Sequence, residues 1–188
     1  MTERVPAVFR FLKGDEGAFT QVVEEWQTKV YNLAWRFLGN REDAQDVAQE
    51  TFLAVFRSIK GLRDPRSFST WLYRITLNQC RAKWRQRTPE LSLDDPVPGK
   101  GGDDQFEPQF ADERTDVAAE LELKDLVCKA LINTSVEHRT AIILKEYIGL
   151  SLEEVAEVMG CPLSTAKSRL YHGLRGVQKN LRRLGARH

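Results

Sequence analysis

A stripe of basic and hydrogen-bonding residues is the first feature of this sequence that could bind another molecule. Between Pro65 and Pro89 there is no Asp or Glu but there are six Lys or Arg. Residues four, three and four apart share one face of a helix, and this polar stripe consists of Arg74, Asn78, Arg81 and Arg85. Basic groups bind phosphates, and interleaved aromatic rings such as Trp84 can stack on unpaired bases. The combination is suited to melted DNA, although core packing is the favoured interpretation for Trp71.

A second such group lies near the C-terminus. Ser151 and Glu154 have the spacing of a capping box, Gly160 permits a tight turn, and Pro162 leads into a second, short helix. These parts make a helix-turn-helix over residues 151–172, the motif that reads duplex DNA. The recognition face of its second helix holds Ser164, Thr165, Lys167, Ser168, Arg169, Tyr171 and His172.

The alternative for this segment is an ordinary helical hairpin with a solvated charged face. No acidic residue follows Glu157, whereas seven Lys or Arg do, Arg175 among them. A solvated face normally mixes both signs of charge. Phosphate contact is therefore the better interpretation.

An acidic face lies opposite the apolar stripe of another predicted helix. It consists of Asp43, Asp46, Gln49 and Glu50. No His or clustered Cys accompanies these residues, which disfavours a metal site or an acid–base pair. A protein-docking face is favoured, and an inert solvated face stays open as the alternative.

Helices must position all of these groups. Apolar residues recur at steps of three and four, which predicts amphipathic helices over 16–38, 44–59, 67–87, 117–131 and 136–148. Gly39 and Gly61 are helix-stop signals. Short connections between the first three helices predict a compact bundle. No strand-like alternation of useful length occurs, so the fold class is all-α.

Charge and composition divide the chain into three parts. The formal net charge of +1 conceals +5 over residues 1–87, −9 over 88–125 and +5 over 126–188. Residues 88–116 also hold four Pro and the run Gly99–Gly102, a composition typical of a linker. We expect two small helical domains over 1–88 and 117–188, joined by a flexible acidic linker over 89–116.

Other functional classes have little support. Cys80, Cys128 and Cys161 lie far apart, which favours a reducing compartment and no metal. The N-terminus has no apolar core of signal-peptide length and no apolar run approaches the ~18 residues of a membrane span, so we expect a cytoplasmic protein without membrane insertion. No His lies beside a plausible nucleophile and no Gly-rich phosphate loop occurs. We expect no catalytic residue, no cofactor and no enzymatic activity.

Two motifs resemble a known family. Asp43-Ala-Gln-Asp-Val-Ala-Gln-Glu-Thr-Phe-Leu53, followed by Phe68-Ser-Thr-Trp-Leu-Tyr-Arg-Ile75, resembles region 2 of group 4 (extracytoplasmic function, ECF) bacterial sigma factors of the sigma-70 family. Gly149-Leu-Ser-Leu-Glu-Glu-Val-Ala-Glu-Val-Met-Gly160 and Thr165-Ala-Lys-Ser-Arg-Leu170 resemble region 4. The resemblance covers essentially the whole chain, in the family's order and spacing.

The resemblance implies a sigma factor that binds core RNA polymerase, recognises −10 and −35 promoter elements and promotes promoter melting in a stress or envelope response. The polymerase β′ clamp helices would meet Asp43, Asp46, Gln49 and Glu50, and the β flap and an anti-sigma factor are further expected contacts. The −10 element would meet Leu62, Arg63, Arg66, Phe68, Arg74, Asn78, Arg81 and Arg85. The −35 element would meet Thr165, Lys167, Ser168, Arg169, Tyr171, His172 and Arg175.

The chain departs from the family pattern twice. Thr134-Ser135 stands where members commonly have Leu-Pro, and serine can cap the helix that follows. Tyr171-His172-Gly173-Leu174 stands in place of a basic pair, with Arg175 after it. The main rival function is a helix-turn-helix regulator whose residues 1–87 sense a signal, but no ligand pocket or phosphoacceptor Asp is recognisable there.

Overall fold

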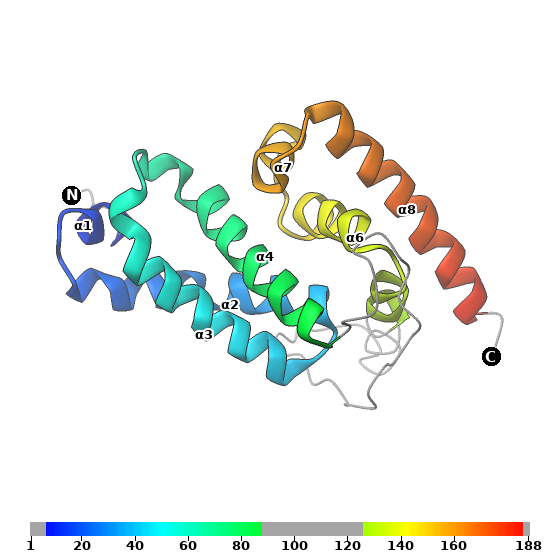
Figure 1. Cartoon of the computed structure of the whole chain (residues 1–188), viewed down its shortest axis with the longest axis horizontal. Helices are drawn as coiled ribbons and strands as arrows, with labels where there is room; N and C mark the ends of the chain where they lie inside the picture. The colour runs from blue at the N-terminus through cyan, green and yellow to red at the C-terminus, as the bar shows by residue number, and fades with distance from the viewer. Residues whose placement is uncertain (1–6, 88–125, 186–188) are drawn as a thin grey trace, which may run out of the picture.

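The computed structural model describes residues 7–87 and 126–185, and every regular element within these two ranges is helical. The predicted all-α fold is confirmed. Figure 1 shows the N-terminal helices at one end of the molecule and the C-terminal helices at the other. No helix in the two described ranges is long and apolar enough to cross a membrane. The predicted linker over 89–116 lies outside the described residues.

The N-terminal half is a helical bundle. Its elements are α1 (Ala7–Leu12), α2 (Gly17–Leu38), α3 (Arg41–Ser58), the short 3-10 helices η1 (Ile59–Gly61) and η2 (Pro65–Ser67), and α4 (Phe68–Arg87). The three long helices agree with the predictions to within three residues at each end. Helix α1 was not predicted, because six residues are too few to display a helical repeat.

A two-residue connection fixes α2 against α3. Gly39 ends α2 in the left-handed conformation, at a φ of 68°, and its amide donates to the Trp35 carbonyl. Only glycine adopts this conformation at no steric cost. Asn40 then caps α3 by accepting a hydrogen bond from the Asp43 amide at 3.0 Å. The chain therefore reverses at once, and α2 and α3 pack along each other.

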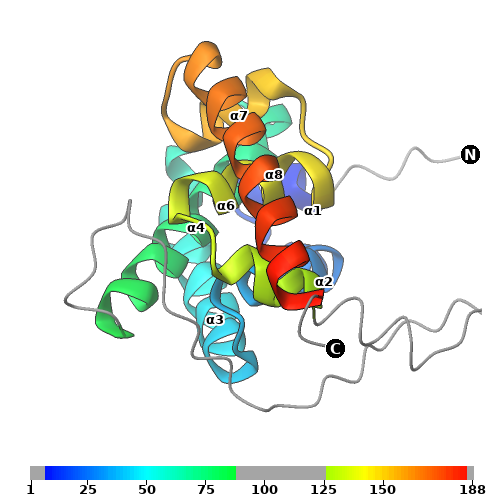
Figure 2. The same ribbon diagram turned by 90° about the vertical axis from the view of Figure 1, so that its right-hand side faces the viewer.

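The C-terminal half begins with a helical segment over 126–132. It continues with α6 (Val136–Ile142), the π-helix η3 (Ile143–Tyr147), α7 (Leu152–Met159) and α8 (Leu163–Gly185). Figure 2 shows α8 running along the outer side of α6. The second helix of the helix-turn-helix was predicted to be short, but α8 has 23 residues.

The start signals of these helices act differently. Ser151 and Glu154 form the predicted capping box, with hydrogen bonds of 2.7 and 3.1 Å. Ser135 occupies the N-cap of α6, but its side chain makes no capping hydrogen bond. Helix α6 forms nevertheless, since Val136 and its buried neighbours pack into the core.

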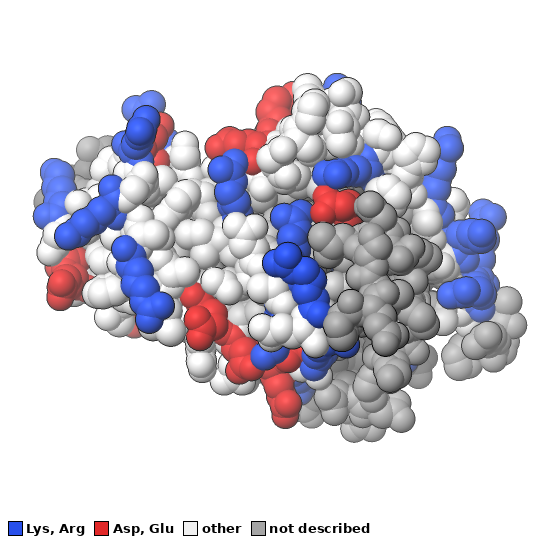
Figure 3. All heavy atoms as spheres, in the orientation of Figure 1, with Lys and Arg blue, Asp and Glu red and all other residues white. Residues whose placement is uncertain are grey.

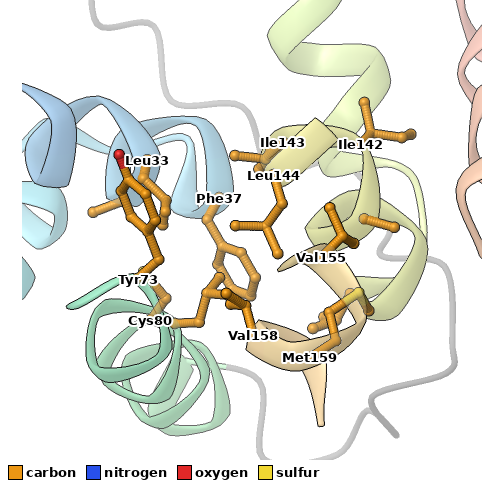
Figure 4. Close-up of a cluster of buried hydrophobic side chains, with 14 of the residues drawn as sticks. Leu33, Phe37, Tyr73, Cys80, Ile142, Ile143, Leu144, Val155, Val158 and Met159 are labelled. Atoms are coloured by element: carbon orange, nitrogen blue, oxygen red, sulfur yellow. The ribbon is translucent and has the colours of Figure 1, made fainter. Parts of the chain in front are cut away.

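The two halves share one apolar core. Leu33 and Phe37 of α2 and Tyr73 and Leu77 of α4 belong to the same buried cluster as side chains from the C-terminal half. The C-terminal contributors include Ile143, Leu144, Val155 and Val158. Figure 4 shows Leu33, Phe37 and Tyr73 on the side of the cluster that faces them. A second cluster, confined to α1–α4 and η1, includes Val22, Phe52 and Leu72. The interface between the halves is therefore as well buried as the interior of the N-terminal bundle.

A buried arginine joins the halves. Arg139 of α6 is 0% exposed and donates hydrogen bonds to the carbonyls of Leu131, Ile132, Thr134 and Phe37. The guanidinium also lies 4.7 Å from the centre of the Trp84 ring on α4. Burial lowers the pKa of Arg139 to about 9, so the side chain stays charged at neutral pH.

Two glycines of α8 give a matched test of the packing between α6 and α8. A Cβ at Gly173 would lie 2.9 Å from Ile142 Cδ1 and 3.1 Å from the His138 carbonyl oxygen, whereas at Gly176 the nearest atom is 3.8 Å away. We predict that Gly173→Ala lowers the free energy of unfolding by about 1–3 kcal/mol through overpacking. Gly176→Ala should raise it by about 0.5–1 kcal/mol through helix propensity.

Thermal unfolding followed by circular dichroism measures both changes. Equal effects of the two substitutions would contradict the close approach of α8 to α6.

Candidate nucleic-acid interface

The helix-turn-helix presents a polar face to solvent. Gly160 closes α7 in the left-handed conformation, at a φ of 63°, and Ala166 and Leu170 bury the inner side of α8. Among the predicted −35 residues, Lys167, Ser168, Tyr171, His172 and Arg175 are exposed and Thr165 is half-buried. The exception is Arg169, whose Nη1 lies 2.8 Å from Glu137 Oε2.

The second half of α8 adds positive charge. Lys179, Arg182 and Arg183 are exposed there, and Figure 3 shows basic side chains along the α8 edge of the molecule. A row of cations beside a reading face suits the phosphates of the same duplex.

The polar stripe of α4 is divided by its contacts. Asn78 and Arg85 are exposed. Arg74 donates to the Glu157 carbonyl at 2.5 Å, and Arg81 Nη2 lies 3.3 Å from Glu137 Oε1. Two of its cations therefore contact the C-terminal half in this structure.

The loop before α4 forms one side of an open hollow of about 580 Å³. Leu62, Arg63 and Pro65 line it from the segment before α4, Phe9 lines it from α1, and Lys13 lines it from the turn after α1. Asp64 holds the loop by accepting a hydrogen bond from the Arg66 amide at 2.9 Å. Phe9 and Lys13 were not predicted as site residues, because neither α1 nor the turn after it gave a sequence signal.

Phe68 corrects the sequence prediction. It was expected to contact the −10 element, but it is 3% exposed. Its ring lies edge-on to Trp26 with 5.5 Å between centroids, and it also packs near Trp71. Phe68 belongs to the core that supports the loop, since the start of α4 turns this side chain toward α2. Trp71 is half-buried against the same core, as the sequence favoured.

The acidic face of α3 is partly used within the fold. Asp43 is only 6% exposed, and its oxygens lie 3.4 Å from Lys83 Nζ and 2.5 Å from Arg87 Nε. Asp46 accepts a 2.8 Å hydrogen bond from Lys83, which raises the pKa of that lysine. Asp43 therefore fastens α3 to α4 instead of facing a partner, which corrects the prediction for this residue.

The open part of this face lies further along α3. Gln49 and Glu50 are exposed, and beside them Leu53 is 47% exposed. A single exposed leucine is ordinary on a protein surface, so Leu53 is a candidate contact only because it lies beside the exposed Gln49 and Glu50. Leu53 was not predicted, because position 53 falls between the apolar and the acidic sides of the sequence pattern.

Groups for other chemistry are sparse in the described parts. Residues 7–87 and 126–185 contain no cluster of three His, Cys, Asp or Glu that could hold a metal ion. Cys80 is 0% exposed, and burial raises the pKa of its thiol. The helix-turn-helix and the cations that follow it define a DNA-binding class of protein, and the polar stripe of α4 gives the other half a basic surface as well.

Comparison with known sequences identifies the family. Residues 22–90 match Sigma-70 region 2, and residues 135–175 match Sigma-70, region 4. The chain is 36% identical over 174 residues to the ECF RNA polymerase sigma factor SigW of Bacillus subtilis, which covers 92% of this chain and 93% of that protein. It is 33% identical to the RNA polymerase sigma-H factor of Pseudomonas aeruginosa, over 94% of this chain and 93% of that protein.

Solved structures share the fold. CnrH in complex with the cytosolic domain of CnrY matches with a TM-score of 0.67 and 23% identity, over 93% of this chain and 94% of that chain. The sigma factor RpoE of Bartonella quintana in complex with the anti-sigma factor NepR matches with a TM-score of 0.66 and 22% identity, over 87% and 96%.

The chain belongs to the ECF sigma factors of the sigma-70 family. It is a sigma factor that directs RNA polymerase to promoters for transcription initiation.

Proposed function

We propose that the two halves divide promoter recognition between them. The half over residues 1–88 binds core polymerase and captures the unpaired −10 element, and the half over 117–188 reads the −35 element as duplex. The segment over 89–116 joins them. The observation that carries this proposal is the presence of one acid-poor basic surface on each half, of which only the C-terminal one is a helix-turn-helix.

The −10 surface comprises the polar stripe and the preceding loop. Asn78, Arg85, Arg63 and Arg66 are exposed and face solvent, so they can reach DNA without rearrangement. Phe9 and Lys13 extend this surface across the hollow, where a ring and a cation suit an unpaired nucleotide. Leu62 forms the apolar side of the hollow.

The −35 surface is the recognition face of α8. Lys167, Ser168, Tyr171 and His172 contact base edges in the major groove, with Thr165 and Arg169 at its margin. Arg175 and the cations after it bind phosphates. This division follows the general rule that base contacts specify and phosphate contacts position.

Core polymerase docks on the open part of the acidic face. Gln49, Glu50 and Leu53 contact the β′ clamp helices, with Asp46 at the edge. The C-terminal half meets the β flap. An anti-sigma factor is a further proposed partner, supported by two similar folds that were solved in complex with a partner protein, one of them named as an anti-sigma factor. Acting with core polymerase, the chain works in the cytoplasm and itself catalyses no reaction.

Reconstitution with core RNA polymerase tests the proposal directly. Run-off transcription on promoter fragments should start at specific positions that core polymerase alone does not use. Absence of specific starts would contradict the proposed function.

The first of three predictions concerns docking. Glu50→Lys places a cation where the proposed surface is acidic, and like-charge juxtaposition at an interface is costly. We expect affinity for core polymerase to fall by about tenfold or more. Glu25→Lys makes the same charge change on an exposed position of α2 and should leave core affinity unaltered. If core polymerase retains both variants equally in a pull-down, the proposed docking face is wrong.

The second prediction separates phosphate from base contacts on α8. Arg182→Ala should weaken binding to every duplex about equally and lower the salt slope by roughly one unit. Lys167→Ala should cost about 1–3 kcal/mol on the cognate −35 sequence and relax preference there. Fluorescence anisotropy with cognate and scrambled duplexes at several salt concentrations measures both. If both variants weaken the two duplexes alike, the recognition face is assigned wrongly.

The third prediction concerns Asn78, which is uncharged and can hydrogen-bond a base edge. Asn78→Ala should leave the salt dependence of holoenzyme binding nearly unchanged, yet reduce initiation on duplex promoters. A template with the −10 bases already unpaired should recover opening but lose sequence preference. Gln86→Ala removes an exposed amide from another face of α4 and is the control. Permanganate footprinting measures promoter opening. If Asn78→Ala opens the promoter like the wild type and keeps the same −10 sequence preference, Asn78 has only a structural role.

A further inference from the structure

One carboxylate joins the two proposed DNA-binding surfaces. Glu137 lies in the first turn of α6, with Oε1 3.3 Å from Arg81 Nη2 and Oε2 2.8 Å from Arg169 Nη1. Arg81 belongs to the −10 surface on α4, and Arg169 belongs to the −35 surface on α8. The side chains of Glu137, Arg81 and Arg169 are 17%, 19% and 29% exposed. Solvent therefore screens these ion pairs less than fully exposed ones.

A neighbouring contact points the same way. Arg74 of the polar stripe donates to the Glu157 carbonyl of α7, and the Thr70 hydroxyl lies 3.5 Å from a carboxylate oxygen of Glu157. Helix α4 thus turns one side of its basic stripe toward α6 and α7. Figure 3 shows acidic side chains among basic ones where the ribbons of α4 and α6 approach each other in Figure 1.

This arrangement cannot span a promoter. Elements centred near −10 and −35 lie about 25 base pairs apart, which is roughly 85 Å of straight duplex at 3.4 Å per base pair. Arg81 and Arg169 bind the two oxygens of a single carboxylate, so they are immediate neighbours. Contact with both elements at once therefore requires these ion pairs to break.

We propose that Glu137 is an autoinhibitory latch, which holds Arg81 and Arg169 away from DNA in the free chain. The inference rests on the proposed function, because it takes both arginines as DNA contacts. A carboxylate offers a guanidinium the same paired acceptor oxygens as a phosphate. Glu137 therefore competes with the DNA backbone for one cation on each half.

The latch leaves one hydrogen-bond donor of Arg81 without an acceptor. Within the described residues, the buried Nε of Arg81 has no hydrogen-bond partner. A buried donor without an acceptor carries the full cost of its desolvation. Arg81 gains an acceptor for this donor when it leaves Glu137 for a phosphate and water, so the contact can be displaced by DNA.

Binding of the free, full-length chain to a fluorescein-labelled random-sequence duplex tests the latch. Glu137→Gln keeps the side-chain size but removes the charge. We expect it to tighten binding by about threefold to tenfold, the scale expected for one half-buried ion-pair network. Glu146→Gln makes the same charge change at an exposed glutamate of the same half, to which the described structure assigns no ion pair. It should change affinity by less than about twofold, because the charge is screened. Circular dichroism verifies that both variants are folded.

The gain must depend on the released arginine. In an Arg169→Ala background, Glu137→Gln should produce a clearly smaller gain than in the wild type. No gain from Glu137→Gln, an equal gain from Glu146→Gln, or an undiminished gain in the Arg169→Ala background would each overturn the latch. The proposed function fails in a different assay, namely when the wild-type chain with core polymerase gives no specific transcription starts.

Discussion

The arrangement of the two halves depends on the buried guanidinium of Arg139. It is fully enclosed, and the groups that stabilise its charge are carbonyl oxygens and the rings of Trp84 and Phe37. Phe37 lies at the C-terminal end of α2, and Leu131 and Ile132 end the segment over 126–132. The last carbonyls of a helix lack intrahelical partners and carry partial negative charge. One cation thereby donates hydrogen bonds to two helix ends that lie far apart in sequence. The carbonyls at those ends in turn stabilise the buried charge of Arg139.

Helix α4 both packs into the core shared by the halves and carries the polar stripe. Tyr73, Leu77 and Cys80 on its inner side join the core shared by the halves, and Arg139 packs on the ring of Trp84 one turn further along. The polar stripe runs along the border of that buried surface. Whether its arginines meet the other half or DNA is therefore linked to the packing beneath them. The halves also approach closely at Gly39, where a Cβ would lie 2.0 Å from Ile132 Cδ1. The two halves can therefore shift little against each other without losing this contact.

The sequence predicted what depends on near neighbours in the chain. Helical periods, the capping box at Ser151 and the turn at Gly160 each involve residues within four positions of one another, and all are present. The error at Asp43, and the burial of Arg139, concern contacts between distant positions. Asp43 meets Arg87 of α4, and Arg139 meets Phe37, which is 102 positions away. A charged residue reads as exposed in any periodic pattern, so burial of Asp43 and Arg139 could not be foreseen. The prediction for Phe68 failed for a different reason. An aromatic residue beside a basic stripe is equally compatible with stacking on bases and with packing in a core.

Charge counted along the sequence also overstates what the folded chain offers to DNA. Each end carries a net +5, but ion pairs and hydrogen bonds to Glu137 and Glu157 occupy Arg74, Arg81 and Arg169. Counterion release follows the number of phosphates that cations neutralise in the complex, not the formal charge. Cations held by internal acceptors add to that number only after those contacts break. The free energy of separating the halves is therefore subtracted from DNA binding by the free chain. Under the proposed latch, a partner that binds the separated halves supplies that free energy before DNA arrives, so partner binding and DNA binding are linked equilibria.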